Sequence, residues 1–80
     1  MIDYILNIIH EKFGLKVDSS KTANVLFLRI NGIDNYSLAR WMIEEFDSIK
    51  VTVKDKEGYK FSNFGWIKVE ESTNKELVLT

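Results

Sequence analysis

Two stretches of the chain carry apolar side chains at the three- and four-residue spacing that is typical of an amphipathic helix. The first spans residues 3–13 and precedes Gly14, which can adopt the left-handed conformation that ends a helix. The second spans residues 36–47, and Asp34, Asn35 or Ser37 can cap its N-terminus. The apolar stripes are Ile2, Ile5, Leu6, Ile9 and Phe13 in the first helix, and Leu38, Ala39, Met42 and Phe46 in the second.

Four further stretches have the composition or the alternation of β-strands. They are residues 25–30, residues 49–54, a long strand over residues 59–71, and residues 75–79. Turn residues separate the last three strands, so two successive hairpins are expected, with Val53 facing Phe61 and Val69 facing Leu77. Residues 16–24 are polar and are interpreted as a loop, and a short strand over residues 15–17 is left open as an alternative.

The element order is therefore α-β-α-β-β-β, in a single domain over residues 1–80. The most economical packing of these elements is an α+β fold, in which one antiparallel four-stranded sheet has both helices on one face. The other face of such a sheet is left to solvent or to a partner.

Side-chain alternation predicts which residues lie on that second face. Ile67 and Val69 suit the core, so Trp66 and Lys68 have the opposite direction. Tyr59 and Phe61 share the direction of the core residues. A bulge between Asn63 and Gly65 could turn Phe64 inward, and this alternative stays open. The residues expected to form a basic and aromatic binding face are Phe64, Trp66, Lys60, Lys68, Lys50, Lys54, Phe27 and Arg29.

Composition narrows the classes of function. The net charge of −1 argues against a general nucleic-acid coat, and the chain has no cysteine for disulfides or thiolate metal sites. No apolar run has the length of a membrane span, so we expect no membrane insertion and a cytoplasmic location. His10 is the one histidine and has no predicted catalytic companion, so no catalytic residue, metal or cofactor is expected.

The hypothesis that these patterns favour is a small, non-enzymatic module that binds another protein through the basic and aromatic face. It would act as an inhibitor, an immunity factor or an adaptor, and the lysine-, isoleucine- and asparagine-rich composition is typical of phage or mobile-element proteins. Self-association as a homodimer, or cover of the same face by residues 16–24, would also bury the exposed rings. The alternative function is single-stranded nucleic-acid binding, in which the rings stack on bases and the lysines hold phosphates.

Overall fold

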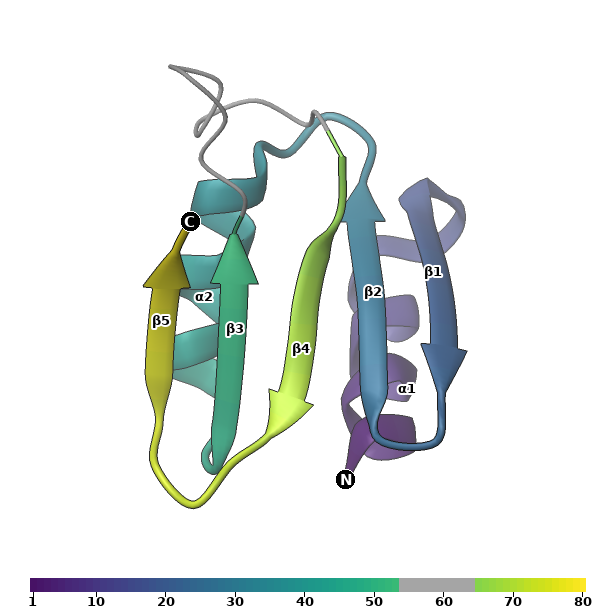
Figure 1. Ribbon diagram of the computed structural model, residues 1–80. Helices are drawn as coiled ribbons and strands as arrows, with labels where there is room; N and C mark the ends of the chain where they lie inside the picture. The colour runs from purple at the N-terminus through teal and green to yellow at the C-terminus, as the bar shows by residue number, and fades with distance from the viewer. Residues whose placement is uncertain (54–64) are drawn as a thin grey trace.

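A five-stranded mixed sheet with two helices on one of its faces forms the fold (Figure 1). The structure is a computed structural model, and it describes residues 1–53 and 65–80. The strand order across the sheet is β1-β2-β4-β3-β5. In chain order the elements are α1 (Ile2–Phe13), the 3-10 turn η1 (Gly14–Lys16), β1 (Val17–Thr22), β2 (Val25–Ile30), α2 (Asn35–Glu45), β3 (Ile49–Val53), β4 (Ile67–Glu71) and β5 (Glu76–Leu79).

Both predicted helices are confirmed, and their ends follow from local chemistry. The Asp34 side chain accepts the backbone N–H of Ser37 at 2.9 Å, so Asp34 is the cap of α2 among the three candidates. Gly14 ends α1 with a φ of 60°, in the region that favours glycine. Each helix then turns its apolar stripe toward the sheet, and Ile5, Ile9 and Met42 are fully buried.

The prediction of an antiparallel four-stranded sheet is wrong, because residues 17–22 add a fifth strand and β5 runs parallel to β3. The predicted loop is instead the edge strand β1, which pairs with β2 along its whole length. Every residue of β1 after Val17 is exposed, so the strand carries no alternating apolar pattern that could identify it. An edge strand needs only one partner and can be polar on both faces.

The predicted hairpin between residues 67–71 and 75–79 is also wrong, because β4 lies between β2 and β3. Val69 pairs with Leu26 on one side and Val51 on the other, and Leu77 pairs with Val51 instead. The connection from β4 to β5 passes beneath the start of β3, where the Ser72 N–H donates to the Ser48 carbonyl at 2.9 Å. Crossing one strand requires a span of about 10 Å, and four extended residues can reach about 13 Å.

The core consists of side chains from both helices and from β2, β3 and β4. Figure 1 shows the two layers, helices and sheet, that contribute them. Alternate residues of β2, β3 and β4 point into it, as their parity predicts. The fully or almost fully buried strand residues are Leu26, Leu28, Ile30, Ile49, Val51, Val53, Ile67 and Val69. The predicted hairpin at residues 53–61, with core residues Tyr59 and Phe61, lies outside the described residues.

Candidate functional site

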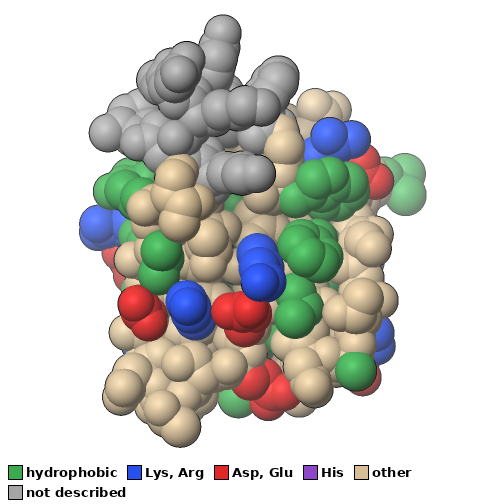
Figure 2. All heavy atoms as spheres, viewed as in Figure 1, with side chains coloured by type: hydrophobic (Ala, Val, Ile, Leu, Met, Phe, Trp, Pro, Cys, Tyr) green, Lys and Arg blue, Asp and Glu red, His purple; other side chains and the backbone are tan. Residues whose placement is uncertain are grey.

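We call the sheet surface that faces away from α1 and α2 the outer face, and Figure 2 views it directly. Strand register places its residues in rows that cross the sheet. The middle row contains Ser20, Phe27, Lys68, Thr52 and Val78, and a neighbouring row contains Thr22, Val25, Glu70, Lys50 and Glu76. Among residues 1–53 and 65–80, no helix or strand packs over this face.

The side chains of Trp66, Arg29 and Asp18 contact one another in a row at the end of the outer face next to η1. The Arg29 guanidinium lies over the Trp66 ring, with its central carbon 4.7 Å from the ring centroid. Nε and Nη2 of Arg29 donate to one carboxylate oxygen of Asp18, at 3.2 and 3.1 Å. Asp18 and Arg29 face each other in the register of β1 and β2, so backbone pairing brings the two charges together. Arg29 and Trp66 therefore restrict each other's side-chain conformations at the surface.

Hydrophobic side chains continue from this cluster along β2, where Figure 2 shows them gathered over the strand. Val25 and Phe27 are half-buried, although they point away from the core, and Trp66 keeps 38% of its surface exposed. Gly65, with a φ of 82°, precedes Trp66 at the entry to β4. The outward direction expected for Trp66 from strand parity is the direction that the structure has, with Ile67 beside it fully buried.

The outer face is charge-balanced rather than basic over the part that the structure describes. The Lys68 ammonium forms an ion pair with the Glu70 carboxylate at 3.0 Å, and the side chain of Glu70 is only 27% exposed. Lys50 lies between Glu70 of β4 and Glu76 of β5 in the strand register. Arg29 pairs with Asp18. Every described cation of the face therefore has a carboxylate neighbour. The predicted excess of lysines also includes Lys54 and Lys60, which lie outside the described residues, so it stays a prediction.

Of the eight residues predicted for the binding face, five are described, and they lie on the outer face over three neighbouring strands or their ends. These five are Phe27, Arg29, Trp66, Lys68 and Lys50. Lys54, Lys60 and Phe64 lie outside the described residues, as does the open question of a bulge at Phe64. Sequence reasoning missed Asp18, because residues 16–24 were interpreted as a loop, and it did not give Glu70 and Glu76 their role as partners of the lysines.

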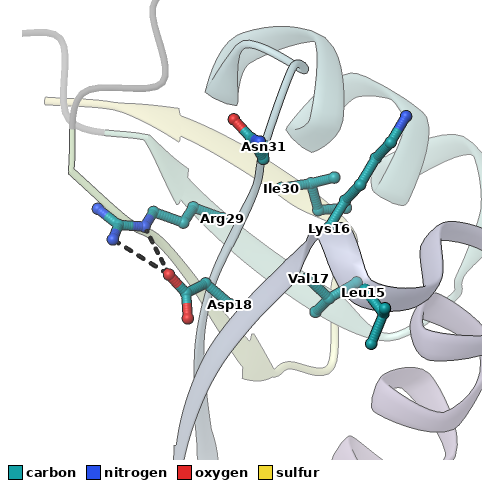
Figure 3. A pocket seen from close by; sticks show the side chains of 7 residues that line it. All are labelled: Leu15, Lys16, Val17, Asp18, Arg29, Ile30 and Asn31. Carbon is teal, nitrogen blue, oxygen red and sulfur yellow. Dashed lines mark hydrogen bonds and ion pairs between the residues drawn. The ribbon is translucent and has the colours of Figure 1, made fainter.

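A hollow of about 440 Å³ lies at the open end of the β1–β2 pair (Figure 3). Leu15, Lys16 and Asn31 contribute to its lining, together with Arg29 and Asp18. Figure 3 shows the Arg29 and Asp18 side chains pointing to one side of the two strands, and Leu15 and Lys16 pointing away from them. The cationic groups of Arg29 and Lys16 do not converge, so the hollow does not form an anion site.

We call the side of the molecule that α1 and α2 form the helical side, and aromatic contacts join its two helices. Trp41 contacts Phe13 and Phe46 edge-to-face, with centroids 5.5 and 5.9 Å apart, and these contacts join α2 to α1. Lys12 lies 5.7 Å from the centroids of both Phe13 and Trp41. His10 is exposed on α1, and the described residues contain no group of three or more potential metal ligands. In the described ranges, neither helix is long and apolar enough to cross a bilayer.

Comparison with protein-family models, with curated proteins and with solved structures finds no match to this chain.

Proposed function

We propose that the chain is a non-enzymatic module that binds another protein through its outer face, as an inhibitor, an immunity factor or an adaptor. The observation that supports this most strongly is the cluster of Trp66, Arg29 and Phe27 on a sheet face that no described element covers. Tryptophan and arginine are the residue types most enriched at the centres of protein interfaces. Here both are partly ordered before any partner binds, which lowers the entropy lost on association.

The distribution of charge indicates the chemistry of the partner surface. An apolar column along β2 and the start of β4 lies between ion pairs, Asp18–Arg29 at one end and Lys68–Glu70 along one side. A protein interface commonly has such an apolar centre with a polar rim. The complementary surface would carry an apolar or aromatic centre and a mixture of both charges, rather than a strong excess of one sign.

Single-stranded nucleic acid is the alternative ligand, and the described residues favour it less. A nucleic-acid groove combines stacking rings with cations that are free to contact phosphates. Arg29 and Lys68 instead contact carboxylates, and Lys50 has acidic neighbours on both adjacent strands. A phosphate would have to compete with each of these carboxylates.

The proposal is tested by comparing what the intact chain captures from lysate of its host with what two variants capture. Trp66→Ala removes the ring at the proposed centre, and Tyr4→Ala removes a ring that is 63% exposed on the helical side. We expect a protein that binds the unmodified chain and Tyr4→Ala but binds Trp66→Ala at least about 30-fold more weakly, which is the effect of losing one hot-spot residue.

Equal binding by all three proteins, or loss only with Tyr4→Ala, would contradict docking through the outer face. A parallel titration with a labelled single strand at low and high salt separates the alternative. Binding that weakens steeply with salt and requires Trp66 would favour nucleic acid over a protein partner.

A further inference from the structure

Beyond docking on another protein, the two edges of the sheet differ in how well they are protected against pairing with a second sheet. Edge strands usually carry charges, bulges or prolines that discourage such pairing. The β1 edge is polar and exposed after Val17, and its Lys21 makes an ion pair with Asp3 of α1. The β5 edge has the sequence ELVL, with one charge at its start and no proline.

The hydrogen bonds of β5 show which of its backbone groups are available. The Thr80 N–H donates to the Val53 carbonyl at 3.0 Å, so residues of even number in β5 direct their backbone groups toward β3. In a parallel pair the intervening residues direct theirs the opposite way, so the N–H and C=O groups of Leu77 and Leu79 point outward from the sheet. No described strand lies beyond them.

We propose that two copies of the chain pair through this edge, antiparallel, with Val78 of each copy on the two-fold axis. In this register Leu77 of one copy faces Leu79 of the other, and each such pair can exchange two backbone hydrogen bonds. Glu76 then faces Thr80 of the second copy, so no like charges oppose each other. The strand is therefore self-complementary in both its backbone groups and its side chains.

Side chains on the helical side of the same edge add to this contact. Leu79 is 44% exposed although it points toward the helical side, and the pairing places Leu77 of the second copy beside it. Trp41 lies on the side of α2 that faces α1, because it contacts Phe13. Ile43 lies on the opposite margin of α2 and is therefore on the side toward β5. Pairing of the two β5 strands would bring the two copies of α2 next to each other along this margin.

The dimer would be weak, because two strands of four residues bury less than the roughly 800 Å² per partner of a standard interface. We expect a dissociation constant of about 10–500 µM, which corresponds to a mostly monomeric chain at low micromolar concentration. The outer face remains free in this arrangement, so the dimer and the proposed partner can bind together.

Sedimentation equilibrium of the unmodified chain over about 10 µM to 1 mM, a range that brackets the expected affinity, tests the pairing. Leu79→Pro removes an outward N–H from each copy without removing a bond to β3, and proline is tolerated at such an edge position. Two of the four intermolecular hydrogen bonds are lost, so the dissociation constant should rise about 30-fold. Leu79→Val keeps the N–H and an apolar side chain, and its dissociation constant should stay within about threefold of the original.

Amide exchange on the unmodified chain gives a readout that needs no variant. The amides of Leu77 and Leu79 should become more protected as concentration rises, while the Thr80 amide, bonded within the sheet, stays protected throughout. A chain that remains monomeric at about 1 mM, well above the expected dissociation constant, would overturn the proposal. So would a dimer that Leu79→Pro leaves intact and Trp66→Ala dissociates, because that result assigns self-association to the outer face.

Discussion

Substitutions at the adjacent residues Ile67 and Lys68 should differ greatly in their effect on stability, because the two side chains lie on opposite faces of β4. Ile67 is fully buried and pairs with Leu28 in the register of β2. Changing it to alanine removes three carbons, worth about 2.4 kcal/mol of transfer free energy at ~0.8 kcal/mol each. The cavity left in a central strand raises the expected loss to about 3–4 kcal/mol.

Lys68 points to the outer face, where its ammonium pairs with Glu70 at 3.0 Å. The Lys68 side chain is 43% exposed, so Lys68→Ala should lower the free energy of unfolding by about 1 kcal/mol or less. This substitution is the matched control for Ile67→Ala, because it alters the same strand one residue further along.

Urea unfolding followed by circular dichroism measures both effects. With a slope of about 1 kcal/mol per molar urea, Ile67→Ala should move the midpoint by about 3–4 M and Lys68→Ala by about 1 M or less. A domain of this size has a total stability of about 4–12 kcal/mol. Ile67→Val, with an expected loss of about 1 kcal/mol, therefore serves as the measurable substitution if the alanine variant does not fold. A loss below about 1 kcal/mol for Ile67→Ala together with more than about 2 kcal/mol for Lys68→Ala would refute the assignment of faces.

The contacts of Arg29, Asp34 and Lys21 each have a measurable consequence. A double-mutant cycle on Arg29 and Trp66, measured by urea unfolding, should give a coupling energy of about 0.5–1 kcal/mol, and additive effects would show that the cation–ring contact contributes nothing. Asp34→Ala removes the N-terminal cap of α2 and should lower stability by about 1 kcal/mol, whereas Asp34→Asn should retain most of it. The hydrogen bond and the charge of Lys21 lower the pKa of the Asp3 carboxyl. The stability that this pair contributes is therefore present above the ordinary carboxylate pKa and is lost as pH falls through the lowered pKa. An NMR titration should show the pKa of Asp3 returning toward its ordinary value in Lys21→Gln, and an unchanged pKa would contradict this cause.

The sequence predicts those parts of the fold that local patterns determine. The bounds of β2 and the buried set of Leu26, Leu28 and Ile30 follow from alternation, because one face of that strand must meet the core. The outward direction of Trp66 follows from the same rule, since Ile67 beside it is buried.

Strand order is not a local property, and it is where the prediction failed. The turn residues between Glu71 and Glu76 fit a hairpin, but the same connection also reaches across β3 to its far side. Nothing in the alternation of β4 distinguishes a strand at the end of a meander from one inserted between two others. For the same reason, the charge of the outer face could not be obtained from its lysines alone, because β1 and β5 contribute Asp18 and Glu76 through long-range pairing.

The most direct test of docking through the outer face is site-specific photo-crosslinking to the captured partner. A photoreactive phenylalanine replaces Phe27 in one preparation and Tyr4 in another, which places the probe on the outer face or on the helical side of a folded chain. The proposed function predicts a crosslinked partner from position 27 and none from position 4. A partner that binds both preparations but crosslinks only from position 4 would contradict it.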